Sequence, residues 1–95
     1  MPAAKRWMDF NEDNLKQLPN SYGVYQLAND KKEIIYIGDG KLKHNISMHS
    51  SDKDAVESIV YFRYRENDSK KSSKQRKNIL LKEYREKNGK MPEFN

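Results

Sequence analysis

The sequence of 95 residues contains no cysteine. This absence excludes disulfide bonds, thiolate zinc sites and cysteine nucleophiles, and a cytoplasmic, intracellular location is the default expectation. Long hydrophobic runs are also missing. No apolar stretch approaches the ~18 residues that a membrane-spanning helix needs, and residues 1–8 are too short and polar for a signal peptide. We therefore expect no membrane partner.

Hydrophobic residues are scarce, at 35 %, and no more abundant than charged residues, also at 35 %. A chain of this length buries only ~60 to 65 % of its unfolded surface, so it has room for one modest core. The six tyrosines and three phenylalanines must supply much of that core. We expect a single domain over residues 1–95, in which residues 1–10 form a flexible N-terminal tail.

The net charge of +5 is unevenly distributed along the chain. Residues 1–69 carry ten Lys or Arg against eleven Asp or Glu, whereas residues 70–95 carry nine against three. A basic block of this kind is typical of proteins that contact a phosphate backbone. The candidate nucleic-acid-binding residues are Lys70, Lys71, Lys74, Arg76, Lys77 and Arg85.

The order of sequence patterns favours an α+β layer sandwich. Strand composition over residues 21–29 and 33–38, with turn residues between them, predicts a hairpin. Residues 58–65 predict a third strand, which completes a three-stranded antiparallel sheet flanked by helices. Helical patterns occupy residues 11–18, 41–49 and 74–90, and a short helical turn is expected over residues 55–58. The last helix is expected to bury Ile79, Leu80, Leu81 and Tyr84 and to end at Gly89.

The third strand alternates in polarity, which predicts a sheet with one solvated face. One face is expected to carry Val60, Phe62 and Tyr64. The other face is expected to carry Ile59, Tyr61, Arg63 and Arg65.

The predicted hairpin contains two short motifs at a specific interval. Gly23-Val24-Tyr25 is followed, after ten intervening residues, by Tyr36-Ile37-Gly38. Leu18-Pro19 precedes the first motif, and the chain closes with Pro92-Glu93-Phe94-Asn95. Together these motifs resemble the GIY-YIG nuclease family over residues 18–95. The resemblance implies a GIY-YIG-like layer sandwich.

The resemblance also implies roles for Tyr25, Tyr36 and Gly38 as the family's catalytic positions. In the family the two tyrosines lie at the active groove, one helps to take a proton from the attacking water, and the glycine leaves room for the phosphodiester. A phenol with a pKa of about 10 is a poor base at neutral pH, so the family adds an arginine and a divalent metal held by a glutamate.

This sequence departs from the family at both of those added positions. The positions that match the arginine are Asn45 and Ile46, and residues 40–58 contain no arginine. The position that matches the metal-binding glutamate is Lys77, or Arg76 if the alignment shifts by one. Glu83 and Glu86 cannot replace it, since they lie on other faces or too far along the helix. We therefore expect no metal site and no cofactor.

Histidines offer little further chemistry. His44 and His49 fail as a metal pair, because five residues on a helix separate side chains by about 140°. His44 stays a candidate for a substitute general base.

The expected function is therefore nucleic-acid binding without cleavage, with DNA favoured over RNA as the partner. One alternative is an active endonuclease that depends on Mg²⁺ or Mn²⁺ and uses altered catalytic residues. Another is a scaffold whose basic helix binds an acidic protein partner. The oligomeric state is left open.

Overall fold

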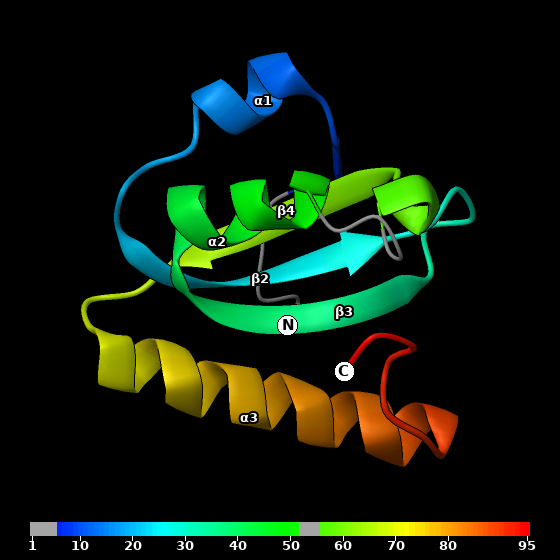
Figure 1. Cartoon of the computed structure of the whole chain (residues 1–95). Helices are drawn as coiled ribbons and strands as arrows, with labels where there is room; N and C mark the ends of the chain where they lie inside the picture. The colour runs from blue at the N-terminus through cyan, green and yellow to red at the C-terminus, as the bar shows by residue number, and fades with distance from the viewer. Residues whose placement is uncertain (1–5, 52–55) are drawn as a thin grey trace.

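A computed structural model describes residues 6–51 and 56–95 of the chain. The elements in chain order are β1 (Met8–Asp9), α1 (Glu12–Lys16), β2 (Tyr22–Ala28), β3 (Ile34–Lys41), α2 (Leu42–Met48), the 3-10 turns η1 (His49–Ser51) and η2 (Val56–Ser58), β4 (Tyr61–Glu66) and α3 (Lys70–Asn88). The strands form one antiparallel sheet in the order β1-β4-β2-β3. Helices α1 and α2 lie over one face of the sheet and α3 lies under the other (Figure 1). The expected α+β class is confirmed.

The expectation of three strands is wrong, because the sheet has a fourth strand at its edge. Met8 and Asp9 pair with Phe62 and Tyr61 of β4. A strand of two residues is too short to show an alternating pattern, so its sequence gives no signal. This strand lies inside the stretch expected to be a flexible tail, and residues 1–5 of that tail lie outside the described residues.

Strands β2 and β3 form the expected hairpin. The turn is closed by Asn29, whose side-chain oxygen accepts hydrogen bonds from the backbone N–H groups of Lys31 (3.0 Å) and Glu33 (2.9 Å). Such bonds from an Asn side chain are a common way to stabilise a turn. β3 continues to Lys41, beyond the expected end at Gly38, because it pairs with β2 as far back as Tyr22.

Strand β2 is buried on both faces, so the domain has two cores. Tyr25 and Leu27 point to the side of α2, where they belong to a cluster that also holds Leu42 and Phe62. On the other face Val24 forms a smaller cluster with Ile37 of β3 and Leu80 of α3. Helix α2 and helix α3 are thus held to the same strand from opposite sides.

Helix α3 is bounded by a cap at each end. The Ser69 side chain accepts a hydrogen bond from the Ser72 N–H (3.1 Å), and Gly89 ends the helix in the left-handed conformation (φ 74°). The expected burial of Ile79 is wrong, since this side chain is 47 % exposed. It is turned about 100° from the buried Leu80, and the core on this side is too narrow to cover both.

The expected alternation of side chains holds within strand β4 and fails for Ile59, which precedes the strand. Phe62 is fully buried in the cluster under α2, and Tyr64 packs against the same cluster. The expected placement of Ile59 with the arginines is wrong, because Ile59 is buried in the Phe62 cluster. This residue precedes the first strand residue, Tyr61, so strict alternation does not apply to it.

The C-terminal tail covers part of the free edge of β3. The Phe94 N–H donates to the Ile35 carbonyl (2.9 Å). The Asn95 side chain then acts like one residue of a further strand: its Oδ1 accepts from the Ile37 N–H (2.8 Å) and its Nδ2 donates to the Ile37 carbonyl (2.9 Å). Backbone N–H and carbonyl groups at this edge of β3, which would otherwise be unpaired, gain hydrogen-bond partners in this way.

Replacement of Asn95 with Ala removes both side-chain hydrogen bonds to Ile37. We expect the free energy of unfolding to fall by about 1 to 3 kcal/mol, which corresponds to two hydrogen bonds of ordinary strength. Urea denaturation followed by circular dichroism measures this loss. The control is Glu93→Ala, which alters an exposed side chain of the same tail. Equal stability of the two variants would contradict the role given to Asn95.

Candidate functional site

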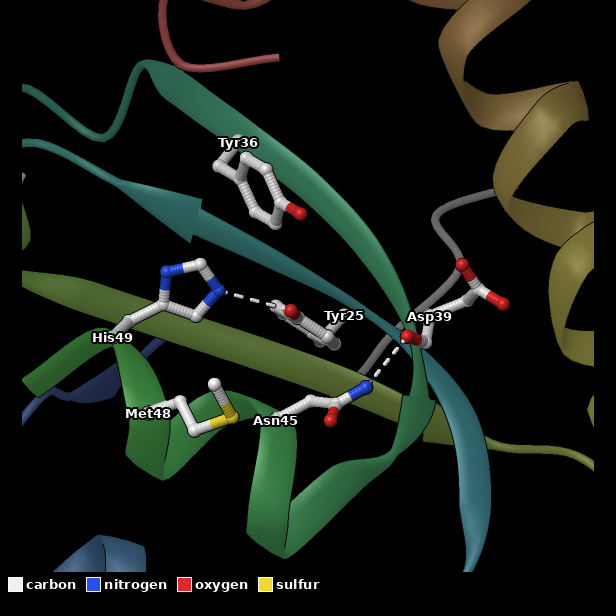
Figure 2. A pocket seen from close by; sticks show the side chains of 6 residues that line it. All are labelled: Tyr25, Tyr36, Asp39, Asn45, Met48 and His49. Atoms are coloured by element: carbon white, nitrogen blue, oxygen red, sulfur yellow. Dashed lines mark hydrogen bonds between the residues drawn. The ribbon is translucent and has the colours of Figure 1, made fainter. Parts of the chain in front are cut away.

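A groove of about 360 Å³ opens between the β2–β3 hairpin and helix α2. Its lining consists of Tyr25, Tyr36, Asp39, Asn45, Met48 and His49. The hairpin supplies the two tyrosines and the aspartate, and α2 with its C-terminal turn supplies the other three (Figure 2). Residues from two distant stretches of sequence therefore meet in one concave surface.

The groove depends on the absence of a side chain at Gly38. A Cβ atom built there would lie 2.5 Å from the Tyr25 hydroxyl and 2.7 Å from the Tyr36 ring. Those distances are impossible for real atoms, so only glycine allows both rings to lie against β3 here. Gly38 thus makes room for the rings of both tyrosines.

Three aromatic rings form a contiguous cluster on the floor of the groove. The Tyr25 hydroxyl is hydrogen-bonded to His49 Nε2 at 2.9 Å. The rings of Tyr36 and His49 lie 4.8 Å apart between centroids, and those of Tyr25 and Tyr36 lie 5.9 Å apart. His49 therefore holds both tyrosines from the side of α2 (Figure 2).

Tyr25 is a neutral group throughout the ordinary pH range. Burial raises the pKa of its hydroxyl far above the usual value, and the neighbouring Tyr36 and Asp39 raise this pKa further. A phenol that resists ionisation donates or accepts a hydrogen bond but does not remove a proton from water at neutral pH. Tyr25 is therefore suited to position His49 and unsuited to be a general base.

The rim of the groove next to α3 is organised around Asp39. The Asn45 amide donates to the Asp39 carbonyl oxygen (2.8 Å), which ties α2 to the end of β3. The Asp39 carboxylate pairs with Lys77 of α3 at 3.0 Å, with the two side chains 16 % and 28 % exposed. The Asp39 carboxylate points away from the tyrosines towards α3 (Figure 2), so this ion pair ties the basic helix to the edge of the groove from the other face of the sheet.

The structure brings together some of the residues singled out from the sequence and leaves others apart. Tyr25, Tyr36 and Asn45 share the groove, Gly38 lies beneath the tyrosines, and Lys77 reaches the rim. His44 is exposed and is not part of the groove lining.

The remaining predicted nucleic-acid contacts all lie on α3. Exposed side chains are those of Lys70, Lys71, Lys74 and Arg85. Arg76 differs from them, since it is half-buried and its Nε atom is enclosed without a hydrogen-bond partner among the described residues.

Sequence reasoning missed His49 and Asp39 as groove residues. His49 was weighed only as a metal partner of His44, yet it follows Asn45 by four residues, a spacing that puts both on one side of a helix. Asp39 lies between Gly38 and Gly40, at the end of the hairpin, where a backbone with φ of 127° at Gly40 leads into α2. The spacing of His49 from Asn45 and the position of Asp39 between two glycines are visible in the sequence, whereas the φ of Gly40 is known only from the structure.

One family matches most of the chain: residues 1–87 match the family described as "Domain of unknown function (DUF7508)". The chain belongs to this family. No curated protein matches it in sequence. The DUF7508 match includes every groove residue and Lys77, whereas Asn95 lies beyond it.

Two further observations on this DUF7508 domain concern metal binding and membrane-spanning helices. Within the described residues, no group of three or more His, Asp or Glu side chains is arranged to hold a metal ion. Over the same residues, no helix is long and apolar enough to cross a membrane.

Because the pKa of Tyr25 is raised by folding, stability should depend on alkaline pH. The unfolded chain ionises this tyrosine above about pH 10, whereas the folded chain keeps its proton, so the free energy of unfolding should fall by up to ~1.4 kcal/mol per pH unit there. Urea denaturation between pH 8 and pH 11 tests this. The Tyr25→Phe variant should lose that part of the slope, and an unchanged slope would refute the assignment.

Proposed function

We propose that the chain is a nucleic-acid-binding domain on a GIY-YIG-like scaffold, which holds a phosphodiester backbone without cleaving it. The observation that carries the proposal is the position of Lys77, whose ammonium pairs with the carboxylate of Asp39, a residue of the groove's edge, on the α3 side of β3. In the family that this sequence resembles, the matching position is a metal-binding glutamate. A cation at this point favours phosphate in place of metal.

The scaffold half of the proposal is supported by the contacts between the motifs. Tyr25 and Tyr36 lie in contact in one groove, and Gly38 makes that contact possible. The closing Asn95 is hydrogen-bonded to Ile37, the central residue of the second motif. Residues that are far apart in sequence but belong to one resemblance are thus joined in space.

The absence of cleavage is supported by the chemistry of the groove. Hydrolysis needs an activated water and a charge that stabilises the transition state. Tyr25 is kept protonated by its raised pKa. The Asn45 amide is engaged with the Asp39 carbonyl, and the Asp39 carboxylate with Lys77. None of these groups matches the arginine and glutamate that the family uses.

The basic surface of α3 meets the sheet at β3, next to the edge of the groove. Lys70, Lys74 and Lys77 are spaced by four and three residues, so they share one side of the helix. Since Lys77 faces Asp39, that side borders β3. Lys71 and Arg85 lie on the adjoining exposed surface. A nucleic-acid backbone that follows this side of α3 reaches the edge of β3 at Asp39, and the groove opens on the other face of the sheet from there.

The double variant Lys70→Gln/Lys74→Gln tests the binding surface. If the intact protein neutralises about four phosphates of duplex DNA, log K should change with log salt with a slope near −3.6, and the variant should reduce this to about −1.8. Affinity at low salt should fall at least about tenfold. Fluorescence anisotropy with a labelled duplex measures both quantities.

The matched control is Lys87→Gln, which removes a charge from the same helix about 80° around its axis from Lys77. It should lower affinity less than either single change at Lys70 or Lys74. An affinity that is insensitive to salt, or equal losses in all variants, would count against nucleic acid and favour an acidic protein partner.

A second candidate function, metal-dependent cleavage, is favoured by one observation: the groove lining includes one residue that has a carboxylate, Asp39. Because that carboxylate is paired with Lys77, we expect no cleavage of DNA or RNA by the protein in Mg²⁺ or Mn²⁺, measured with labelled substrates on gels. The Asn45→Arg/Lys77→Glu variant should gain weak Mn²⁺ binding by calorimetry. Robust Mg²⁺-dependent cleavage by the unmodified protein, abolished by Tyr25→Phe, would reverse the choice between the two functions.

A further inference from the structure

The face of the sheet that carries α3 is only partly covered by that helix. Helix α3 packs on β2 and β3 and makes few contacts with β4 (Figure 1). Arg63 belongs to this face, because its side chain reaches the buried Gln26 on the side of β2 opposite to Tyr25. By alternation Tyr61 and Arg65 share the same face. This part of the sheet is therefore open to solvent and carries the side chains of Tyr61, Arg63 and Arg65.

Arg63 is held rigidly at the centre of this surface. Its Nε donates to the Gln26 side-chain oxygen (2.6 Å), and its guanidinium lies 4.0 Å from the centre of the Trp7 ring. No carboxylate pairs with it among the described residues, so its terminal nitrogens are left for another acceptor. A fixed guanidinium fork of this kind is preorganised for a phosphate or carboxylate.

Partial burial of an unpaired cation is unfavourable in the free protein. Burial lowers the pKa of Arg63, as expected for a cation that loses water without gaining an acid. The packing on Trp7 and Gln26 offsets only part of this cost. An anionic ligand would supply the missing partner.

The neighbouring charges indicate that the anion carries repeated charges. Arg65 follows Arg63 by two residues, which places it ~6.8 Å along the same face. Lys32, from the β2–β3 turn, lies 5.4 Å over the Tyr61 ring at the other end. The register also puts the acidic residue Asp9 opposite Tyr61, beside these cations.

Aromatic rings lie between these cations. Trp7 and Tyr61 are both half-buried, and each has a cation over its ring. Cations that follow a backbone, with aromatic rings on which bases can stack, are what single-stranded nucleic acid requires. A duplex cannot use the rings in this way, because its bases are already stacked within it.

We propose that the surface formed by Trp7, Tyr61, Arg63, Arg65 and Lys32 binds single-stranded nucleic acid. This surface is separate from the groove and from the basic side of α3. The proposal would stand if neither of those bound anything.

Trp7 is the only tryptophan in the chain, so its fluorescence reports on this surface alone. Titration with oligo(dT) or oligo(U) of about 20 nucleotides should quench that fluorescence, since a base stacks near the indole. With three cations engaged, the slope of log K against log salt should be near −2 for a single strand. The same titration with a duplex of equal length should give little quenching.

Two substitutions separate this role from a structural one. Arg65→Gln alters an exposed residue, should keep the fold and should weaken oligo(dT) binding about threefold to tenfold, with a shallower salt slope. Arg63→Gln should weaken it by more than about tenfold. The control Lys16→Gln removes one exposed charge from α1, on the other side of the sheet, and should change nothing.

The test also distinguishes this surface from the proposed function. The Lys70→Gln/Lys74→Gln variant should lose duplex affinity but keep the quenching of Trp7 by oligo(dT). Absence of quenching in the unmodified protein, or identical binding by Arg65→Gln and Lys16→Gln, would overturn the proposal.

Discussion

The contact between Tyr25 and Gly38 is the constraint on which the rest of the site depends. Tyr25 lies in the central strand, and its ring can pack over β3 only because residue 38 has no Cβ. This position brings its hydroxyl to His49, which fixes the end of α2 over the hairpin. The lack of a side chain at Gly38 therefore allows the two tyrosine rings to form the floor of the groove and α2 to be fixed above them. It also allows the burial that keeps the Tyr25 phenol neutral.

The Lys77–Asp39 pair connects the second helical layer to that groove. Half-buried ion pairs add little net stability, because the loss of hydration offsets most of the attraction. What this pair does supply is position: it holds the ammonium of Lys77 at the edge of β3, on the α3 side of the sheet. A bound phosphate would have to compete with Asp39 for Lys77. The ion pair therefore both anchors α3 at this edge and limits the affinity of Lys77 for anions.

Periodic patterns in the sequence were sufficient to predict the hairpin, β4 and the helices, whereas Tyr25, Tyr36 and Asn45 were singled out through the family resemblance. They failed where a side chain's environment is set by distant elements. Ile79 matches the apolar pattern of α3, but the narrow contact with the sheet leaves it exposed. Met8 and Asp9 become a strand only because β4 has a free edge. The spacing of His49 from Asn45 indicates its side of α2, but its hydrogen bond to the Tyr25 hydroxyl joins residues 24 positions apart, which no local pattern reveals.

The charged residues of this domain are distributed differently in the folded structure than along the chain. Residues 1–69 are almost neutral, with ten basic against eleven acidic residues, which directed attention to the last helix alone. The fold separates those charges: Arg63 and Arg65 emerge on the sheet face beside Trp7, whereas Glu66 points to the opposite face, where it accepts from Ser21. Alternation along a strand sorts side chains by face, so a neutral segment can produce a basic surface. The distribution of charge along the sequence therefore finds the basic helix and misses the basic sheet.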